Sequence, residues 1–168
     1  MAKRIKGKLI IIGGAERGDE ERKVLSRVAA EMKGRGRLLI VTAASYEPEG
    51  TGEEYTAIFH ELGHKEVDVV DIRQREDAER PEHLDACERA GGIFFTGGDQ
   101  LRITSQMGDS AMFRCMAERY RDGALIAGTS AGAAAMPYTM IVGGPADESN
   151  RISTLSMAPG LGLLNDVV

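Results

Sequence analysis

The sequence is poor in cysteine and in histidine, with 2 and 3 of them in 168 residues. So few cysteines exclude a disulfide-rich secreted scaffold. Cys87 and Cys115 lie in amphipathic patterns and form no closely spaced pair of the kind that holds a metal. We therefore expect two buried thiols in a reducing compartment, with neither a metal site nor an organic cofactor.

Long apolar runs are also missing. A membrane-spanning helix needs about 20 consecutive apolar residues, and no stretch of this chain approaches that length. A basic N-terminus precedes residues 9–12, which are apolar, but the run stops at Gly13 and Gly14. It is too short for the core of a signal peptide and is expected to be a first β-strand. The sequence thus predicts a cytoplasmic protein that does not bind membranes.

Positive charge is not in excess either, because the formal net charge is -5. Binding to nucleic acid needs clustered lysine and arginine to neutralise phosphates. Here the basic residues are scattered among acidic ones, as Arg17, Arg22 and Lys23 illustrate. We expect solvated faces and no nucleic-acid partner.

Short apolar runs alternate with helical patterns along the chain. Strands are expected at residues 8–12, 37–42, 66–71, 92–96 and 124–127. Helices are expected at residues 19–32, 51–62, 81–90 and 110–121. Thr51 and Glu54 have the spacing of a capping box at the start of the second helix. After Pro137 the pattern weakens, with an edge strand expected at residues 141–142 and a polar loop at residues 145–153.

This alternation predicts an α/β fold: a doubly wound, mostly parallel sheet with helices on both faces. We expect residues 1–168 to form a single α/β domain. In such sheets ligands bind beyond the carboxyl ends of the strands. Three strand ends carry unusual residues here: Gly13 and Gly14, Gly97 and Gly98, and the turn around Ser130.

The turn around Ser130 has the G-x-S-x-G pattern, from Gly128 to Gly132. A buried strand precedes it and an alanine-rich helix follows, which is the context of a nucleophile elbow. A strained backbone there projects the serine hydroxyl above the sheet, and the helix N-terminus favours a developing oxyanion. The alternative is a tight turn in which Ser130 only caps the helix. The pattern favours Ser130 as a nucleophile.

The strand end at residues 97–100 supplies the other expected site residues. A Gly-Gly pair lets backbone amides turn toward a substrate carbonyl. We therefore predict that the amides of Gly98 and Ala131 form the oxyanion hole, and that Gln100 positions the substrate. Asp99 is equally expected to contact the substrate or to cap the next helix.

Five segments together resemble the cyanophycinase family of serine exopeptidases: GGAERG from Gly13, FFTGGDQLRI from Phe94, AGTSAGAAAM from Ala127, MIVGG from Met140 and MAPGLGLL from Met157. This family is related to aspartyl dipeptidase and has a fold like that of class I glutamine amidotransferases. The resemblance implies hydrolysis of cyanophycin, a poly-aspartate with arginine joined to each β-carboxyl, to β-aspartyl-arginine dipeptides. It also implies a homodimer, Ser130 as nucleophile and Gln100 as a residue that contacts substrate.

One feature departs from the family pattern. The family's catalytic histidine, its acidic triad partner and an arginine-rich binding segment follow the stretch that resembles MAPGLGLL. The histidines here, His60, His64 and His83, all precede the nucleophile. We therefore expect a C-terminally truncated chain whose base lies beyond Val168. Two other functions stay open: an aspartyl dipeptidase of the same family, or a catalytically dead binding domain of that fold.

A different enzyme class is suggested by HELGH, residues 60–64, which fits the H-E-x-x-H motif of zinc proteases. That motif needs both histidines on one continuous helix. Gly63 stands where the helix is expected to end, so His64 would leave the helical face. The sequence therefore favours two solvent-facing histidines near a helix C-terminus.

Overall fold

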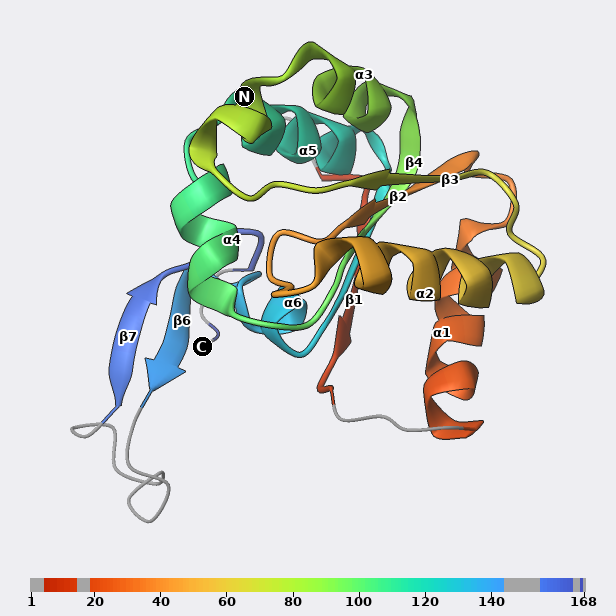
Figure 1. Ribbon diagram of the computed structural model, residues 1–168, viewed down its shortest axis with the longest axis horizontal. Coiled ribbons are helices and arrows are strands. Elements are labelled where there is room, and N and C mark those ends of the chain that lie inside the picture. The colour runs from red at the N-terminus through yellow and green to blue at the C-terminus, as the bar shows by residue number, and fades with distance from the viewer. Residues whose placement is uncertain (1–4, 15–18, 144–154, 165–166, 168) are drawn as a thin grey trace.

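The computed structural model describes residues 5–14, 19–143, 155–164 and 167. Five parallel strands form one sheet in the order β1-β5-β4-β2-β3. Figure 1 shows this sheet between its flanking helices. The strands are β1 (Lys8–Ile12), β2 (Arg37–Val41), β3 (Val67–Val70), β4 (Ala90–Phe95) and β5 (Leu125–Thr129). Both ends of each strand lie within three residues of the bounds that the sequence predicted. β4 and β5 are fully buried, as expected of central strands covered on both faces.

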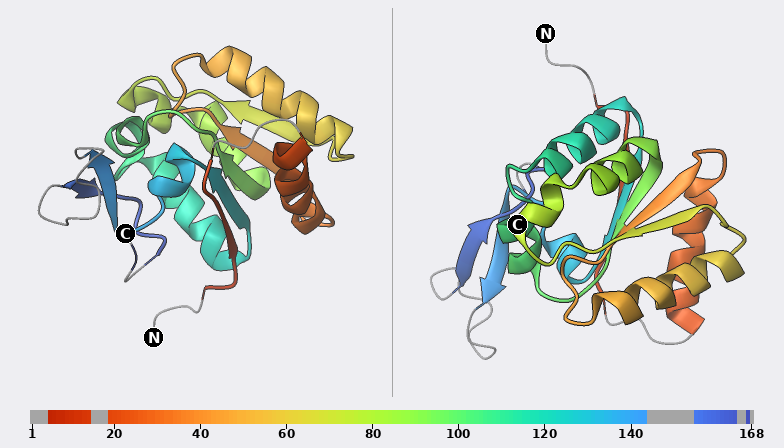
Figure 2. Two further views of the ribbon diagram at one scale, coloured as in Figure 1. Left: turned by 90° about the horizontal axis from the view of Figure 1, so that it is seen from below. Right: turned by 45° about the horizontal axis from the view of Figure 1, so that its top comes forward.

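Helices cover both faces of the sheet, which confirms the predicted α/β fold (Figure 2). The helices are α1 (Asp19–Met32), α2 (Pro48–Glu61), α3 (Pro81–Arg89), α4 (Gln100–Met107), α5 (Ala111–Asp122) and the short α6 (Ala131–Ala134). A 3-10 turn, η1 (Arg75–Glu79), precedes α3. α1 and α2 pack on one face, and the other helices pack on the opposite face.

The two faces have separate apolar cores. Under α1 and α2, Phe59 packs edge-on against Phe94 with ring centroids 5.4 Å apart, and both rings are fully buried. On the other face, methionines from α4, α5 and the segment after α6 pack with Phe95 and Ile126. Alternate residues of β4 therefore point into different cores, which fixes its register in the sheet.

α2 begins earlier than its sequence pattern predicted. Its first residue is Pro48, and Glu47 is the N-cap residue, so Thr51 and Glu54 lie inside the helix. Proline suits the first helical position because its missing N–H has no partner there in any case. The Thr51 hydroxyl lies 2.7 Å from Ser45 Oγ, which accepts a bond from the backbone N–H of Glu47. The prediction of a capping box at Thr51 was therefore wrong.

The segment after α6 forms a hairpin outside the main sheet. β6 (Thr139–Gly143) pairs antiparallel with β7 (Ser156–Pro159) in a separate two-stranded sheet. The strand predicted at residues 141–142 exists, but its partner is β7 and not the edge of the parallel sheet. The polar loop predicted at residues 145–153 lies outside the described residues.

None of the described helices combines the length and the apolar character that crossing a bilayer requires.

Candidate active site

The turn around Ser130 lies at the carboxyl edge of the sheet, between two glycine pairs. Ser130 follows β5, and the two neighbours of β5 in the sheet are β1 and β4. Gly13–Gly14 follows β1, and Gly97–Gly98 follows β4. The parallel register aligns Ile12 with Thr129, so Ser130 and Gly13 leave the sheet at the same level. Three strand ends that are distant in the sequence thus meet at one place.

Ser130 has a strained backbone. Its φ of 51° and ψ of -115° lie outside the regions that a residue with a Cβ atom prefers. Its N–H donates to the Ile12 carbonyl at 3.0 Å, and its own carbonyl accepts from Ala133 and Ala134, the first turn of α6. These bonds on both sides hold the strained conformation. The Ser130 side chain is exposed and makes no capping hydrogen bond, so the structure disfavours a role as a simple helix cap.

Close glycine contacts explain why small residues surround this serine. A Cβ atom on Gly14, whose φ is +91°, would lie 2.7 Å from Ser130 Cβ and 3.1 Å from its Oγ. A Cβ atom on Gly132 would lie 2.5 Å from the Phe95 carbonyl oxygen, so α6 packs closely on β4. The sequence identified the glycines after β1 as unusual but did not assign Gly14 to the site; the structure adds it.

The two residues predicted to form the oxyanion hole are neighbours in sequence of Ser130 and of Gly97, which itself lies close to Ser130. Ala131 is the first residue of α6, where a backbone N–H has no acceptor within the helix. Gly98 follows Gly97, on which a Cβ atom would lie 3.4 Å from Ser130 Cβ and 3.9 Å from its Oγ. Gly98 has a φ of +139°, and a Cβ on it would lie 2.0 Å from the Ala44 carbonyl oxygen. Only glycine fits this backbone path.

Asp99 and Gln100 both have partners within the protein. Asp99 caps α4, because its carboxylate accepts from the N–H of Leu101 at 2.9 Å. Its second oxygen accepts from the Tyr46 hydroxyl at 3.3 Å. Gln100 donates from Nε2 to the Ile141 carbonyl on β6 at 2.9 Å, which joins α4 to the hairpin. Both side chains remain half-exposed at the carboxyl edge.

An apolar cavity of about 310 Å³ opens beside Ser130, on the side of β1 and β6. Among the described residues that line it, Ser130 alone has a polar side chain; the others are Ile11, Gly13, Ala133, Ala134, Pro137, Ile141, Leu164 and Val167. The polar side chains Asp99 and Gln100 lie at the end of β4. Ser130 therefore separates an apolar cavity from a polar strand end.

The three histidines of the chain do not line this cavity. His60 is in the last turn of α2, which ends at Glu61, and Gly63 has a φ of +86°. His64 therefore lies outside the helix, as the sequence predicted, and the two histidines of HELGH do not share one helical face. His83 on α3 lies 2.7 Å from the Asp77 carbonyl through Nδ1. The described part of the chain contains no cluster of three histidine, cysteine or acidic residues suited to a metal.

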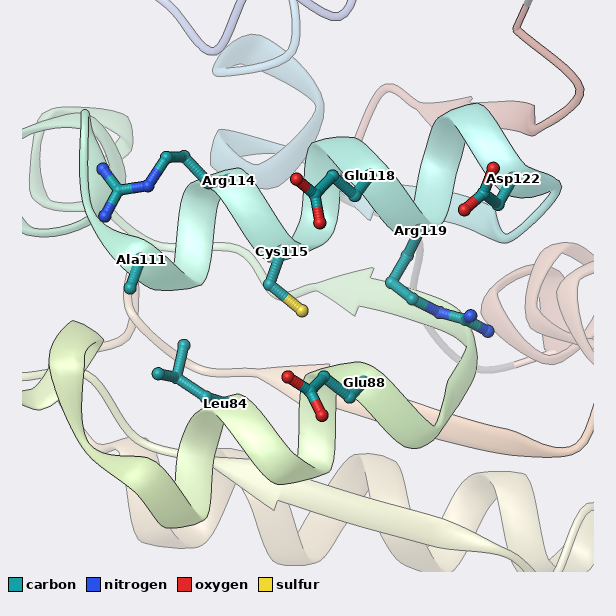
Figure 3. Close-up of a pocket in the computed structure, with 8 residues that line it drawn as sticks. All are labelled: Leu84, Glu88, Ala111, Arg114, Cys115, Glu118, Arg119 and Asp122. Atoms are coloured by element: carbon teal, nitrogen blue, oxygen red, sulfur yellow. The ribbon is translucent and has the colours of Figure 1, made fainter.

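A larger cavity, of about 480 Å³, lies between α3 and α5 and away from Ser130 (Figure 3). The sulfur of Cys115 points into it from α5, facing α3. Cys87 is buried, Cys115 is half-buried, and their thiols are hydrogen-bonded to each other without a disulfide. Burial raises the pKa of both thiols, so neither is an activated nucleophile.

The loop after β2 brings residues to the site that the sequence reasoning missed. It runs beside the end of β4, and the N–H of Asp99 donates to the Ala44 carbonyl at 2.9 Å. Tyr46 in this loop is 72% exposed, and its ring lies 5.2 Å from the guanidinium carbon of Arg102 on α4. The general rule that parallel sheets bind ligands at their carboxyl edge pointed to this loop, but no motif marked Tyr46 or Arg102.

Residues 9–168 match the family model described as peptidase family S51. Cyanophycinase from Trichormus variabilis is 39% identical over 165 residues, which are 95% of this chain and 54% of that protein. Cyanophycinase from Geminocystis herdmanii is 35% identical over 170 residues, covering 100% of this chain and 62% of that protein. The chain thus spans little more than half the length of these relatives.

Two solved structures share the fold at low sequence identity. A peptidase from an acI-B1 Actinobacterium superposes with a TM-score of 0.73 at 21% identity, covering 96% of this chain and 66% of that one. The structure of a putative peptidase E protein from Listeria monocytogenes EGD-e superposes with a TM-score of 0.58 at 19% identity, covering 83% of this chain and 69% of that one. At these identities both likenesses concern the fold alone.

Proposed function

From the premise that this chain belongs to peptidase family S51, we propose that it is the Ser130-bearing part of a serine exopeptidase that hydrolyses cyanophycin to β-aspartyl-arginine dipeptides. The observation that carries the proposal is the conformation of Ser130. An exposed serine with a φ of 51°, between a buried strand and a helix N-terminus, has the geometry of a nucleophile elbow. The sequence identity to two cyanophycinases supports the choice of substrate.

The proposed mechanism is acyl transfer. Ser130 Oγ bonds to the scissile backbone carbonyl carbon while a general base takes its proton. The tetrahedral oxyanion is stabilised by the amides of Gly98 and Ala131. The carbon–nitrogen bond then breaks, the leaving amine takes the proton, and water hydrolyses the resulting ester in a second step. No metal or organic cofactor takes part in these steps.

Gln100 and Asp99 are proposed to contact the substrate from the end of β4. Gln100 uses one amide N–H to hold Ile141, which leaves its carbonyl oxygen and its second N–H for the substrate. Asp99 is anchored by its capping bond and by Tyr46, and its negative charge suits an arginine side chain. We further propose a cytoplasmic homodimer, in line with the family resemblance.

A second candidate function is a binding domain of the same fold that retains the site without turnover. The position of the histidines favours it, since none of the three lines the cavity beside Ser130. A serine is a weak nucleophile without an adjacent base. An aspartyl dipeptidase is the third candidate, with the same serine acting on a shorter β-aspartyl substrate.

The decisive experiment measures release of β-aspartyl-arginine from cyanophycin, hydrolysis of a β-aspartyl dipeptide, and labelling of Ser130 by a fluorophosphonate probe. In the complete enzyme of which this chain is the Ser130-bearing part, cyanophycin hydrolysis together with labelling, both lost in Ser130→Ala, is the expected result. Hydrolysis of the dipeptide alone would instead identify a dipeptidase. Binding of cyanophycin with neither turnover nor labelling would establish the binding domain and overturn the proposed catalysis.

A further inference from the structure

The first turn of α4 presents two polar side chains to opposite sides of the site. Gln100 reaches toward the hairpin and bonds to the Ile141 carbonyl. Arg102 reaches toward the loop after β2, where its Nε donates to the Ala43 carbonyl at 3.3 Å. Gln100 has a proposed role in substrate binding, whereas Arg102 has none in the acyl-transfer steps.

The guanidinium of Arg102 is held in a defined orientation. Its Nε is fixed on Ala43, and its carbon lies 5.2 Å from the centroid of the Tyr46 ring, a cation–π contact. Tyr46 is itself fixed, because its hydroxyl donates to the Asp99 carboxylate at 3.3 Å. An arginine bonded through Nε still has the four N–H groups of its two terminal nitrogens, which form a planar fork.

The terminal nitrogens of Arg102 differ from those of the other half-buried arginines. Arg37 bonds the Asp68 carboxylate through Nε and Nη2. Arg119 and Arg35 each bond backbone carbonyls through Nε and a terminal nitrogen. Arg102 makes a bond through Nε alone, and within the described ranges neither of its terminal nitrogens has an acceptor and no carboxylate pairs with it. A partly desolvated guanidinium whose terminal N–H groups lack acceptors favours the binding of an anion.

The position of Arg102 relative to Ser130 suits a substrate group that lies one branch or a few residues away from the scissile bond. Ser130 follows β5, and the loop that holds Arg102 follows β2, two strands away in the order β5-β4-β2. Adjacent strands are about 4.8 Å apart, so the offset is roughly 10 Å. An extended peptide advances about 3.3 Å per residue, so this offset corresponds to about three residues of substrate backbone or one branched side chain.

We infer that Arg102, held by Tyr46 and Ala43, is a carboxylate-binding residue that determines specificity for the substrate. This inference rests on the proposed function. The β-aspartyl-arginine unit carries two carboxylates: the α-carboxylate of the aspartate and the α-carboxylate of the arginine branch. A planar guanidinium binds either one through two parallel N–H···O bonds.

The test measures binding in a Ser130→Ala background, where no turnover interferes. The ligands are β-aspartyl-arginine and its two mono-amides, each with one carboxylate blocked, studied by titration calorimetry. The variants are Arg102→Gln, Arg102→Lys and the control Arg114→Gln, which removes an exposed arginine on α5 that bonds only the Asp109 carbonyl among the described residues.

Arg102→Gln should weaken binding of the unblocked dipeptide by about 10- to 100-fold, the usual effect of losing a hydrogen bond to a charged group. One mono-amide should bind the parent protein more weakly to the same extent and should be unaffected by Arg102→Gln, which identifies the carboxylate that is bound. Arg102→Lys should give an intermediate loss, because a single ammonium keeps the charge without the fork. Arg114→Gln should bind like the parent.

An equal loss for all three ligands in Arg102→Gln would overturn the inference, because it would mean that Arg102 only supports the loop after β2. A change in thermal unfolding, with unchanged preference among the ligands, would overturn it for the same reason. If no ligand binds to the parent at all, the inference is overturned, whereas the proposed function is decided separately by cyanophycin hydrolysis and labelling of Ser130.

Discussion

The two edges of the parallel sheet are built on opposite principles. At the amino edge, Arg37 at the start of β2 forms two bonds of 2.6 and 2.7 Å to Asp68 on β3, and Arg119 holds the Ala90 carbonyl at the start of β4 at 3.0 and 2.7 Å. At the carboxyl edge, glycine pairs follow the strands and Ser130 is strained. At the amino edge polar side chains are thus bonded across the strands, whereas the part of the carboxyl edge around Ser130 leaves a hydroxyl exposed.

This difference shows how one fold separates stability from function. Paired charges at the amino edge contribute to stability, since the hydrogen bond from Arg37 lowers the pKa of Asp68 against the opposing effect of burial. Strain and close glycine contacts at the carboxyl edge cost stability, but they present a hydroxyl and backbone amides to a ligand. Substitutions at the carboxyl edge should therefore alter activity, and those at the amino edge should alter stability.

The largest effect is expected for Ser130→Ala. In the complete enzyme, turnover should fall about 10⁶-fold, because the members of a catalytic unit act together. Steady-state release of β-aspartyl-arginine from cyanophycin measures it, and substrate binding should survive. The free energy of unfolding should change little, because alanine has the same Cβ atom and the hydroxyl makes no capping bond. Retention of more than a tenth of the activity would remove Ser130 from the mechanism.

Gly14→Ala tests whether the close contacts at the carboxyl edge serve the nucleophile. The new Cβ would lie 2.7 Å from Ser130 Cβ, so the serine must move. A displacement of about 1 Å costs on the order of 10²-fold in rate. Fluorophosphonate labelling of Ser130 should slow by that factor.

The control for this prediction is the neighbouring substitution Gly13→Ala. A Cβ on Gly13 would meet nothing within 4 Å of it among the described residues. Labelling should therefore proceed as in the parent. Equal slowing in both variants would mean that general loosening of the turn, and not contact with Ser130, is responsible.

Gln100→Ala should lower kcat/KM by a factor that corresponds to a loss of roughly 1 to 3 kcal/mol in transition-state binding. This loss is the cost of leaving a polar partner unpaired. Labelling by a small probe should stay nearly unchanged, because Gln100 positions the substrate and takes no part in covalent chemistry. Gln106→Ala is the matched control, since Gln106 lies near the other end of α4 and bonds the Arg73 carbonyl. A parallel fall in labelling and peptidase activity would place Gln100 in the catalytic machinery instead.

Most of the sheet and its flanking helices could be predicted from the sequence, because their periodicity reports burial directly. β4 reads as a continuous apolar run and is fully buried. The start of α2 was misplaced because Thr51 and Glu54 imitate a capping box, while the proline that begins the helix was overlooked. β6 was expected, but its pairing with β7 depends on a contact between distant segments that no local pattern contains.

The part of the candidate site that lies in local motifs could be predicted from the sequence, and the part that depends on contacts between distant segments could not. The turn around Ser130 and the glycines after β4 form local motifs, so the sequence was sufficient to identify them. Their proximity to Gly14 arises from the strand order β1-β5-β4, which local patterns do not specify. Tyr46 and Arg102 belong to separate elements with no motif, and only the fold brings the ring and the guanidinium within 5.2 Å.

The smallest effect is expected at the amino edge, from Asp68→Asn. Loss of the bidentate pair with Arg37 should lower the free energy of unfolding at pH 7 by about 1 kcal/mol, since the pair is partly exposed to solvent. Labelling of Ser130 should not change. Asp85→Asn, which breaks a more exposed pair with Arg89 on α3, is the control and should cost less than about 0.5 kcal/mol.

The pH dependence of this effect has a defined sign. Because the folded pKa of Asp68 is lowered, its contribution is fully present above the unfolded pKa of about 3.9 and is lost as the pH falls through the folded value. The asparagine that replaces Asp68 does not titrate, so the difference in unfolding free energy between parent and variant should shrink as the pH falls below about 4. Urea unfolding at a series of pH values measures it. A difference that stays constant over that range would show that the ion pair is not its source, and that the amino edge is stabilised by packing alone.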